Sequence, residues 1–64
     1  MAYTYEQYIA DCKQDIRDEG YEPEHFIDVA ESMLHSPTFH ALAVKKFGKQ
    51  TKSELKVCVA NDLF

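Results

Sequence analysis

The fold is decided by the stretch SPTFHALAVKKFGKQTKSEL, residues 36–55, which contains one complete helix and the start of the next. Ser36 and the proline after it are typical of an N-cap and a first helical position. Gly48 predicts the end of that helix, because glycine readily takes the left-handed conformation. Thr51 followed by Glu54 is a capping box, which predicts a further helix from Thr51.

The same signals extend toward the N-terminus. Thr4 and Gln7 form another capping box, so we expect a helix from Thr4 to about Asp18, ended by Gly20. Another helix is expected from Pro23 to about His35. Apolar residues at helical spacing give every segment an inner face. These inner positions are Tyr5, Tyr8, Ile9, Cys12 and Ile16; Phe26, Ile27, Ala30, Met33 and Leu34; Phe39, Leu42, Ala43 and Phe47; and Leu55, Cys58, Val59 and Leu63. Lys46 shares the inner side of the third helix and can extend its charged end to solvent.

No long alternating segment and no hairpin turn signal accompany these helices. The predicted fold is therefore all-α, a compact bundle of three to four short helices. Sixty-four residues are enough for one domain, so residues 1–64 are expected to form a single helical domain. An apolar content of 45% argues against disorder.

Cys12 and Cys58 are far apart and belong to no C-x-x-C pair. Both fall on apolar helix faces, which favours reduced core cysteines over a disulfide. The N-terminus does not resemble a signal peptide, and no apolar run approaches the ~20 residues of a membrane span. We expect a soluble, cytoplasmic protein without a membrane partner.

Charge is split along the chain. Residues 1–34 carry nine acidic and two basic residues, a net charge of −7, whereas residues 35–64 carry five lysines and two acids, a net charge of +3. Such asymmetry suggests contact with a charged partner.

The acids of the first half fall into two stripes at i, i+4, i+7 spacing. These candidate partner-binding residues are Asp11, Asp15 and Asp18 in the first helix and Glu24, Asp28 and Glu31 in the second. Antiparallel pairing of the two helices could place the stripes side by side. Like charges at i, i+4 weaken a helix slightly, so the stripes suggest an anionic docking face. The alternative is a solvated outer face that aids solubility. Asp18 and Glu19 also oppose the dipole of the first helix at its C-terminal end, which hints at a role other than stability.

Four tyrosines crowd the N-terminal part, and Tyr3 and Tyr8 are candidate anchors for a partner beside the acids. Tyrosines that only bridge the core and the surface are an equal alternative.

The C-terminal half resembles the centre of a helix-turn-helix, with a glycine turn followed by a capped helix. In that alternative, nucleic acid would contact the polar residues of the turn and of the last helix, which are Lys49, Lys52, Ser53 and Lys56. The acidic first half would repel DNA unless it is turned away, so a nucleic-acid partner is the less favoured expectation.

No catalytic motif is present, and the chain has only two glycines, too few for a phosphate-binding loop. His25, His35 and His40 lack the spacing of metal ligands on one helix face. We therefore expect no catalytic residues, no metal and no cofactor, and a non-enzymatic protein.

Two segments, YTYEQYIAD (residues 3–11) and AVKKFG (residues 43–48), resemble parts of small helical anti-CRISPR proteins of phages. The resemblance implies an inhibitor that binds a host defence or nucleic-acid-processing protein in the host cytoplasm. Together with the acidic stripes, it predicts stoichiometric docking on a basic surface. Two alternatives stay open. One is a DNA-binding regulator that uses the helix from Thr51, and the other is a homodimer in which opposite halves pair head to tail.

Overall fold

The computed structural model describes residues 3–64, and these residues form helices and connecting turns without any strand. The all-α prediction is confirmed. The elements are α1 (Tyr5–Glu19), the 3₁₀ turn η1 (Pro23–His25), α2 (Phe26–Leu34), α3 (Pro37–Phe47) and α4 (Lys52–Asp62).

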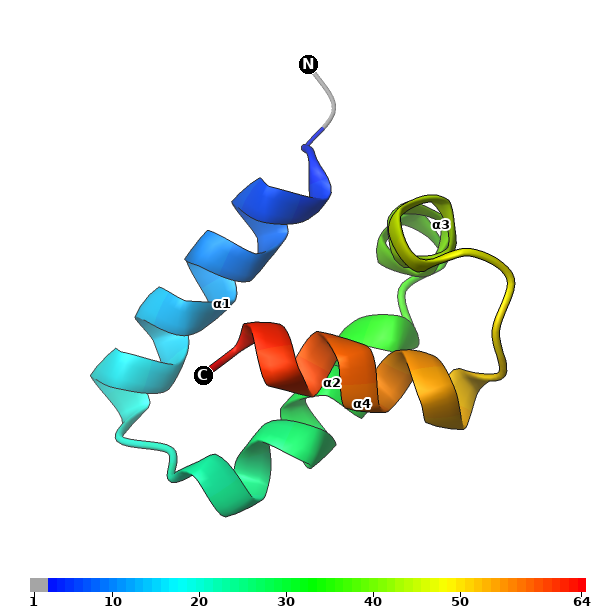
Figure 1. Cartoon of the computed structure of the whole chain (residues 1–64). Coiled ribbons are helices and arrows are strands. Elements are labelled where there is room, and N and C mark those ends of the chain that lie inside the picture. The colour runs from blue at the N-terminus through cyan, green and yellow to red at the C-terminus, as the bar shows by residue number, and fades with distance from the viewer. Residues whose placement is uncertain (1–2) are drawn as a thin grey trace.

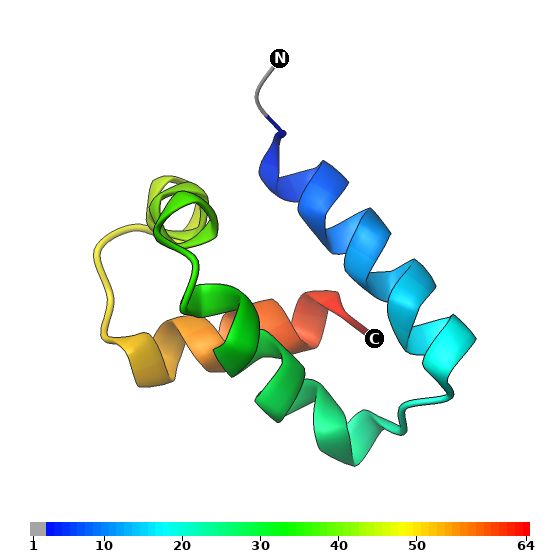
Figure 2. The ribbon, with the colours of Figure 1, turned by 180° about the vertical axis from the view of Figure 1, so that it is seen from behind.

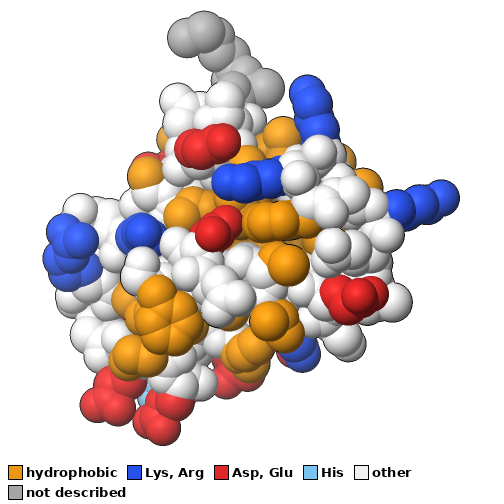
Figure 3. Space-filling view, in the orientation of Figure 1, with side chains coloured by type: hydrophobic (Ala, Val, Ile, Leu, Met, Phe, Trp, Pro, Cys, Tyr) orange, Lys and Arg blue, Asp and Glu red, His pale blue; other side chains and the backbone are white. Residues whose placement is uncertain are grey.

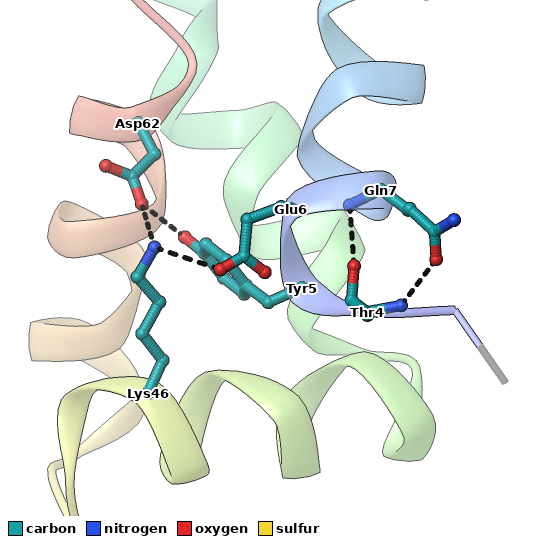
Figure 4. A network of polar contacts seen from close by, with 6 residues as sticks. All are labelled: Thr4, Tyr5, Glu6, Gln7, Lys46 and Asp62. Atoms are coloured by element: carbon teal, nitrogen blue, oxygen red, sulfur yellow. Dashed lines mark hydrogen bonds and ion pairs between the residues drawn. The ribbon is translucent and has the colours of Figure 1, made fainter.

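Helix α1 begins and ends where its local signals place it. The Thr4 hydroxyl accepts a 3.2 Å hydrogen bond from the Gln7 amide, and the Gln7 side chain accepts a 2.8 Å bond from the Thr4 amide (Figure 4). Gly20 has φ 75°, a left-handed conformation, and its amide donates to the Ile16 carbonyl at 2.9 Å. Each end of α1 therefore has partners for backbone groups that a helix leaves free.

The second predicted helix is divided. Residues Pro23–His25 form a tighter 3₁₀ turn, in which the His25 amide donates to the Glu22 carbonyl at 2.9 Å, and the α-helix begins only at Phe26. The predicted inward position of Ile27 is wrong, since 37% of this residue is exposed. It lies about 100° around the helix from buried Phe26, at the edge of the apolar stripe.

Helix α3 begins at Pro37 and ends before Gly48, as predicted. The expected side-chain cap is missing, because the Ser36 hydroxyl makes no capping bond. The Ser36 carbonyl instead accepts the amide of His40 at 2.9 Å. The fixed backbone of the proline at the first helical position is therefore the start signal that operates here.

Helix α4 has the predicted capping box. The Thr51 hydroxyl accepts from the Glu54 amide at 3.2 Å, and the Glu54 carboxylate accepts from the Thr51 amide at 3.1 Å. Leu55 and Val59 are completely buried, while Cys58 is only half-buried. Both cysteines of the chain are free.

The helices pack unequally. Helix α4 lies mainly against α2, and α3 contacts α1, α2 and α4. Figures 1 and 2 show α1 and α2 diverging from the loop that joins them, with the C-terminus between them and α3 seen nearly end-on. The two helices do not pair along their lengths, so the antiparallel arrangement of the acidic stripes does not form.

Tyr5 joins the two ends of the chain. Its ring stacks on Phe39 and meets Phe47 edge-on, with both centroid distances at 5.5 Å. The Nζ atom of Lys46 lies 4.4 Å from the Tyr5 ring centroid and 3.9 Å from the Asp62 carboxylate (Figure 4). These contacts hold α1, α3 and α4 together at one end of the bundle. The buried apolar core of the described residues consists of Tyr5, Ile9, Ile16, Phe26, Ala30, Leu34, Phe39, Ala43, Leu55, Val59, Ala60 and Leu63.

Candidate functional site

Helix α1 has two flanks of opposite charge. At about 100° per residue, Asp11, Asp15 and Asp18 fall on one side of the buried stripe, and Lys13 and Arg17 fall on the other. All three aspartates are exposed. We call the side of α1 that carries these three aspartates the anionic flank.

The basic side of α1 faces the C-terminus. Lys13 and Arg17 line a shallow hollow together with Leu63 and Phe64. Figure 3 shows Lys and Arg side chains over the outer edge of α1, while Asp and Glu gather at the lower end of this face, around the α1–α2 loop. Helical spacing thus separates Lys13 and Arg17 from the anionic flank.

The two predicted tyrosine anchors lie together at the start of α1. The Tyr3 and Tyr8 rings meet edge-on, with their centroids 5.1 Å apart. The Tyr8 ring also meets the Phe39 ring edge-on at a centroid distance of 5.5 Å. Tyr3 is 49% exposed, whereas Tyr8 is half-buried. The neighbouring Asp11 carboxylate raises the pKa of Tyr3, chiefly through a hydrogen bond and then through its charge. Tyr3 is therefore available to a partner, and Tyr8 supports it from the core.

A groove runs between α1 and α2, with a volume of about 540 Å³. Beside Tyr21 and Val29 it continues into a second hollow of about 230 Å³, which His25 and Asp28 also line. We call the two together the α1–α2 groove. Its lining residues are Cys12, Asp15, Ile16, Glu19, Tyr21, His25, Asp28, Val29 and Ser32.

The α1–α2 groove brings together two predicted site residues, Asp15 and Asp28, from different helices. It also adds Glu19 and Tyr21, which are not among the site residues predicted from the sequence. Glu19 did carry a signal, because an acid at a helix C-terminus is unfavourable for the dipole. Tyr21 follows the terminating Gly20 and is 49% exposed, and nothing in the sequence pattern distinguished it from the other tyrosines.

The remaining predicted acids lie elsewhere. Glu31 accepts a 3.2 Å hydrogen bond from the Lys56 ammonium, and this pair lies where α2 and α4 meet. Asp18 accepts a 3.0 Å hydrogen bond from the Gln14 side chain and is outside the groove lining. Glu24 is exposed in η1. The second stripe is therefore divided between the groove and the α2–α4 contact.

The lysine-rich end forms a separate surface. Lys49 lies in the α3–α4 turn, Lys52 and Ser53 are the first residues of α4, and all three are exposed. Lys56 is half-buried and is paired with Glu31. Lys52, Ser53 and Lys56 also border a hollow of about 160 Å³ with Leu34 and His35, residues of the α2 end, and with Glu31. Three of the four predicted nucleic-acid contacts are thus open to solvent.

Cys12 lines the α1–α2 groove. Burial, and to a smaller extent the charge of Asp15, raises the pKa of Cys12, which disfavours the nucleophilic thiolate. Within residues 3–64, no group of three His, Cys, Asp or Glu side chains is placed to hold a metal ion. The helices of the described chain are all too short or too polar to cross a bilayer.

Exposed carboxylates and tyrosines beside a groove can make electrostatic and aromatic contacts with another molecule. Comparison with known proteins found no matching family model, no similar curated protein and no similar solved structure. A proposal of function therefore rests on the sequence and the surfaces of this chain.

Proposed function

We propose that this chain is a small, non-catalytic binding protein that docks its anionic flank and the α1–α2 groove on a basic surface of a partner protein. The observation that carries the proposal is the position of Asp15 and Asp28, which come from two helices and line two adjoining hollows that share Tyr21, Val29 and Ser32. Tyr3 stands exposed toward one end of this surface and Tyr21 toward the other.

Exposed carboxylates and tyrosines would contribute differently to such a contact. Charges at the rim of an interface chiefly raise the association rate and exclude wrong partners. Tyrosine supplies a large contact area at a low cost in side-chain entropy, and it is frequent among the residues that dominate binding energy. In this proposal the carboxylates steer the partner, and Tyr3 anchors it.

The resemblance of residues 3–11 and 43–48 to phage anti-CRISPR proteins supports a proposal for the kind of partner. A phage or mobile-element protein of this kind inhibits a host defence or nucleic-acid-processing protein. Such targets carry basic surfaces that bind nucleic acid. Covering that surface with the anionic flank would block it without any chemical step.

The proposal is tested by affinity capture from cells that naturally carry the chain. We compare the unaltered protein with an Asp15→Lys/Asp28→Lys variant, whose fold is checked by circular dichroism. The control variant, Ala41→Lys/Asn61→Lys, adds lysines at two exposed positions on α3 and α4. We expect a partner that both the unaltered protein and the control retain, that the reversed variant loses, and that associates more slowly at high salt. Equal capture by the reversed variant, or association that is independent of salt, would rule out this function.

A second candidate function rests on the lysine-rich end. Helix α3 is seen nearly end-on in Figure 1 while α4 lies across the view, as the two helices of a helix-turn-helix cross steeply. Exposed Lys49 lies in the α3–α4 turn, and exposed Lys52 and Ser53 are the first residues of α4, a region where such proteins contact DNA. In this case duplex DNA should bind with steep salt dependence and lose affinity in a Lys49→Gln/Lys52→Gln variant. Absence of any shift on duplex DNA at low salt eliminates this candidate.

A further inference from the structure

The α1–α2 groove combines an apolar floor with an acidic rim. Ile16 is 7% exposed, and Val29 and Cys12 are half-buried, so the floor belongs to the edge of the core. Asp15, Glu19 and Asp28 are all exposed around it. A binding partner must therefore satisfy two different requirements at one place.

The charge of the rim is not balanced within the described part of the chain. The ion pairs there join Lys46 to Glu6 and Asp62, and Lys56 to Glu31. None of these carboxylates belongs to the groove. Lys13 and Arg17, the cations nearest in sequence, fall on the opposite side of α1. The negative field over the groove is thus left for a ligand to neutralise.

These two properties define the chemistry of the occupant. A wholly apolar ligand would cover the floor but would remove water from unpaired carboxylates, which is costly. A wholly cationic ligand would pair with the rim but would leave the apolar floor in contact with water. We infer that the α1–α2 groove receives a basic segment of the partner protein, in which one apolar side chain is flanked by Lys or Arg. This inference rests on the proposed function and specifies which part of the partner is recognised.

In this arrangement the apolar side chain of the segment lies on Ile16 and Val29, between α1 and α2. Its neighbouring cations lie beside Asp15 on one side and Asp28 on the other. Recognition then depends on the order of residues in the segment as well as on its charge. A segment with the same number of cations but no apolar residue should bind weakly.

The test uses short fluorescein-labelled peptides of lysine and arginine with a central leucine. One comparison peptide replaces the leucine with serine, and another replaces the cations with glutamate. Binding is measured by fluorescence anisotropy, and the contact is located by two-dimensional amide NMR spectra. We expect the leucine peptide to shift the amide signals of Cys12, Ile16 and Val29. We expect the serine peptide to bind about tenfold more weakly and the glutamate peptide not to bind.

Asp15→Asn and Glu6→Gln are the matched variants. Both remove one exposed carboxylate from α1, but only Asp15 lines the groove, and Glu6 lies outside the anionic flank. We expect Asp15→Asn to reduce the affinity for the leucine peptide about threefold and Glu6→Gln to leave it nearly unchanged. A Val29→Ser variant that remains folded by circular dichroism should reduce the preference for leucine over serine.

The contrary results are distinct. Equal binding of the leucine and serine peptides, or equal effects of Asp15→Asn and Glu6→Gln, would overturn the inference about the groove, while the anionic flank could still dock as proposed. Failure of every basic peptide to bind would also overturn the inference about the groove. The capture experiment would still test the proposed function separately. Concentration-dependent shifts of the same amides without peptide would place a second copy of this chain in the groove and overturn the inference.

Discussion

The Tyr5 hydroxyl donates a 2.7 Å hydrogen bond to a carboxylate oxygen of Asp62, across 57 positions of sequence. Tyr5 is the first residue of α1, and Asp62 is the last residue of α4. Lys46 from α3 lies 3.9 Å from the same carboxylate oxygen (Figure 4). One partly buried polar contact thus joins three helices, in a domain whose small size leaves its stability marginal.

Replacing Tyr5 with phenylalanine removes this hydrogen bond and keeps the ring that packs on Phe39 and Phe47. We expect the free energy of unfolding to fall by about 1 kcal/mol, the usual contribution of one hydrogen bond. Urea denaturation followed by circular dichroism measures it. Tyr21→Phe is the control, because Tyr21 is 49% exposed and its change should stay within about 0.5 kcal/mol. Equal effects of the two substitutions would show that the Tyr5 hydrogen bond adds nothing.

Alkaline pH provides a separate measurement on Tyr5. Burial, followed by the hydrogen bond to Asp62 and its charge, raises the pKa of Tyr5 far above the ordinary value of 10.0. The native state therefore keeps its phenolic proton at pH values where the unfolded chain loses it, so this stabilisation is complete below pH 10 and declines above it. The stability difference between the unaltered protein and Tyr5→Phe should fall by about 1.4 kcal/mol per pH unit above pH 10. Urea titrations at successive alkaline pH values measure the difference, and a constant difference would contradict the prediction.

The two glycines allow a test of backbone conformation without steric clashes. A Cβ atom at Gly20 or Gly48 would meet nothing within 4 Å, so any loss of stability comes from the backbone. Gly20 has φ 75° and ψ 30°, a left-handed conformation that asparagine tolerates, whereas Gly48 has φ 88° and ψ 179°, a region almost confined to glycine.

We expect Gly20→Ala to reduce the free energy of unfolding by about 1 kcal/mol and Gly20→Asn to reduce it less. Gly48→Ala should cost more, up to about 3 kcal/mol, and Gly48→Asn should not recover the loss. Thermal and urea unfolding of the four variants give the order. If Gly48→Ala proves the milder change, the α3–α4 turn must relax into another conformation.

Leu55 tests how far the core depends on α4. It is completely buried, and we expect Leu55→Ala to cost about 2–5 kcal/mol, enough to unfold much of a marginally stable domain. Val57, on the same helix, is 50% exposed, and Val57→Ala should stay within about 0.5 kcal/mol. Circular dichroism at room temperature and in urea compares the two variants. A fully folded and stable Leu55→Ala protein would mean that α4 is not essential to the core.

The two N-terminal tyrosines should separate binding from folding. Tyr3 is exposed and packs on Tyr8, so Tyr3→Ala should change the free energy of unfolding little. The same variant should make the binding free energy of the partner less favourable by at least about 1 kcal/mol. Tyr8→Ala also removes a contact with Phe39 and should lower the stability clearly. Urea denaturation and partner affinity are measured on both variants. Unchanged affinity in Tyr3→Ala would remove Tyr3 from the proposed interface.

Much of the fold could be predicted from local signals. Three of these signals are the capping boxes at Thr4 and Thr51 and the glycine at position 20. Each involves only residues close together in the sequence, so neighbouring side chains largely determine its geometry. The departures were also local. The 3₁₀ turn at Pro23–His25 moves the start of α2 to Phe26, and the Ser36 side chain makes no capping hydrogen bond.

The candidate site was predictable only in part. Spacing placed Asp11, Asp15 and Asp18 on one flank of α1, because helical periodicity alone decides which residues share a face. It could not show that Asp28 would line a hollow next to the one that Asp15 lines, or that Glu31 would pair with Lys56. Those relations depend on the angle at which two helices leave a loop.

The sequence by itself thus determined an all-α chain, the boundaries of most of its helices and the charge on each helical face. The tertiary structure alone decided that α2 packs on α4 rather than along α1, which opens the α1–α2 groove. It also decided that Tyr5 meets Asp62. The physical reason is the sequence distance over which the two kinds of interaction act. Caps and periodicity act over one or two turns, whereas the packing of helices is set by the burial of side chains that lie far apart along the chain.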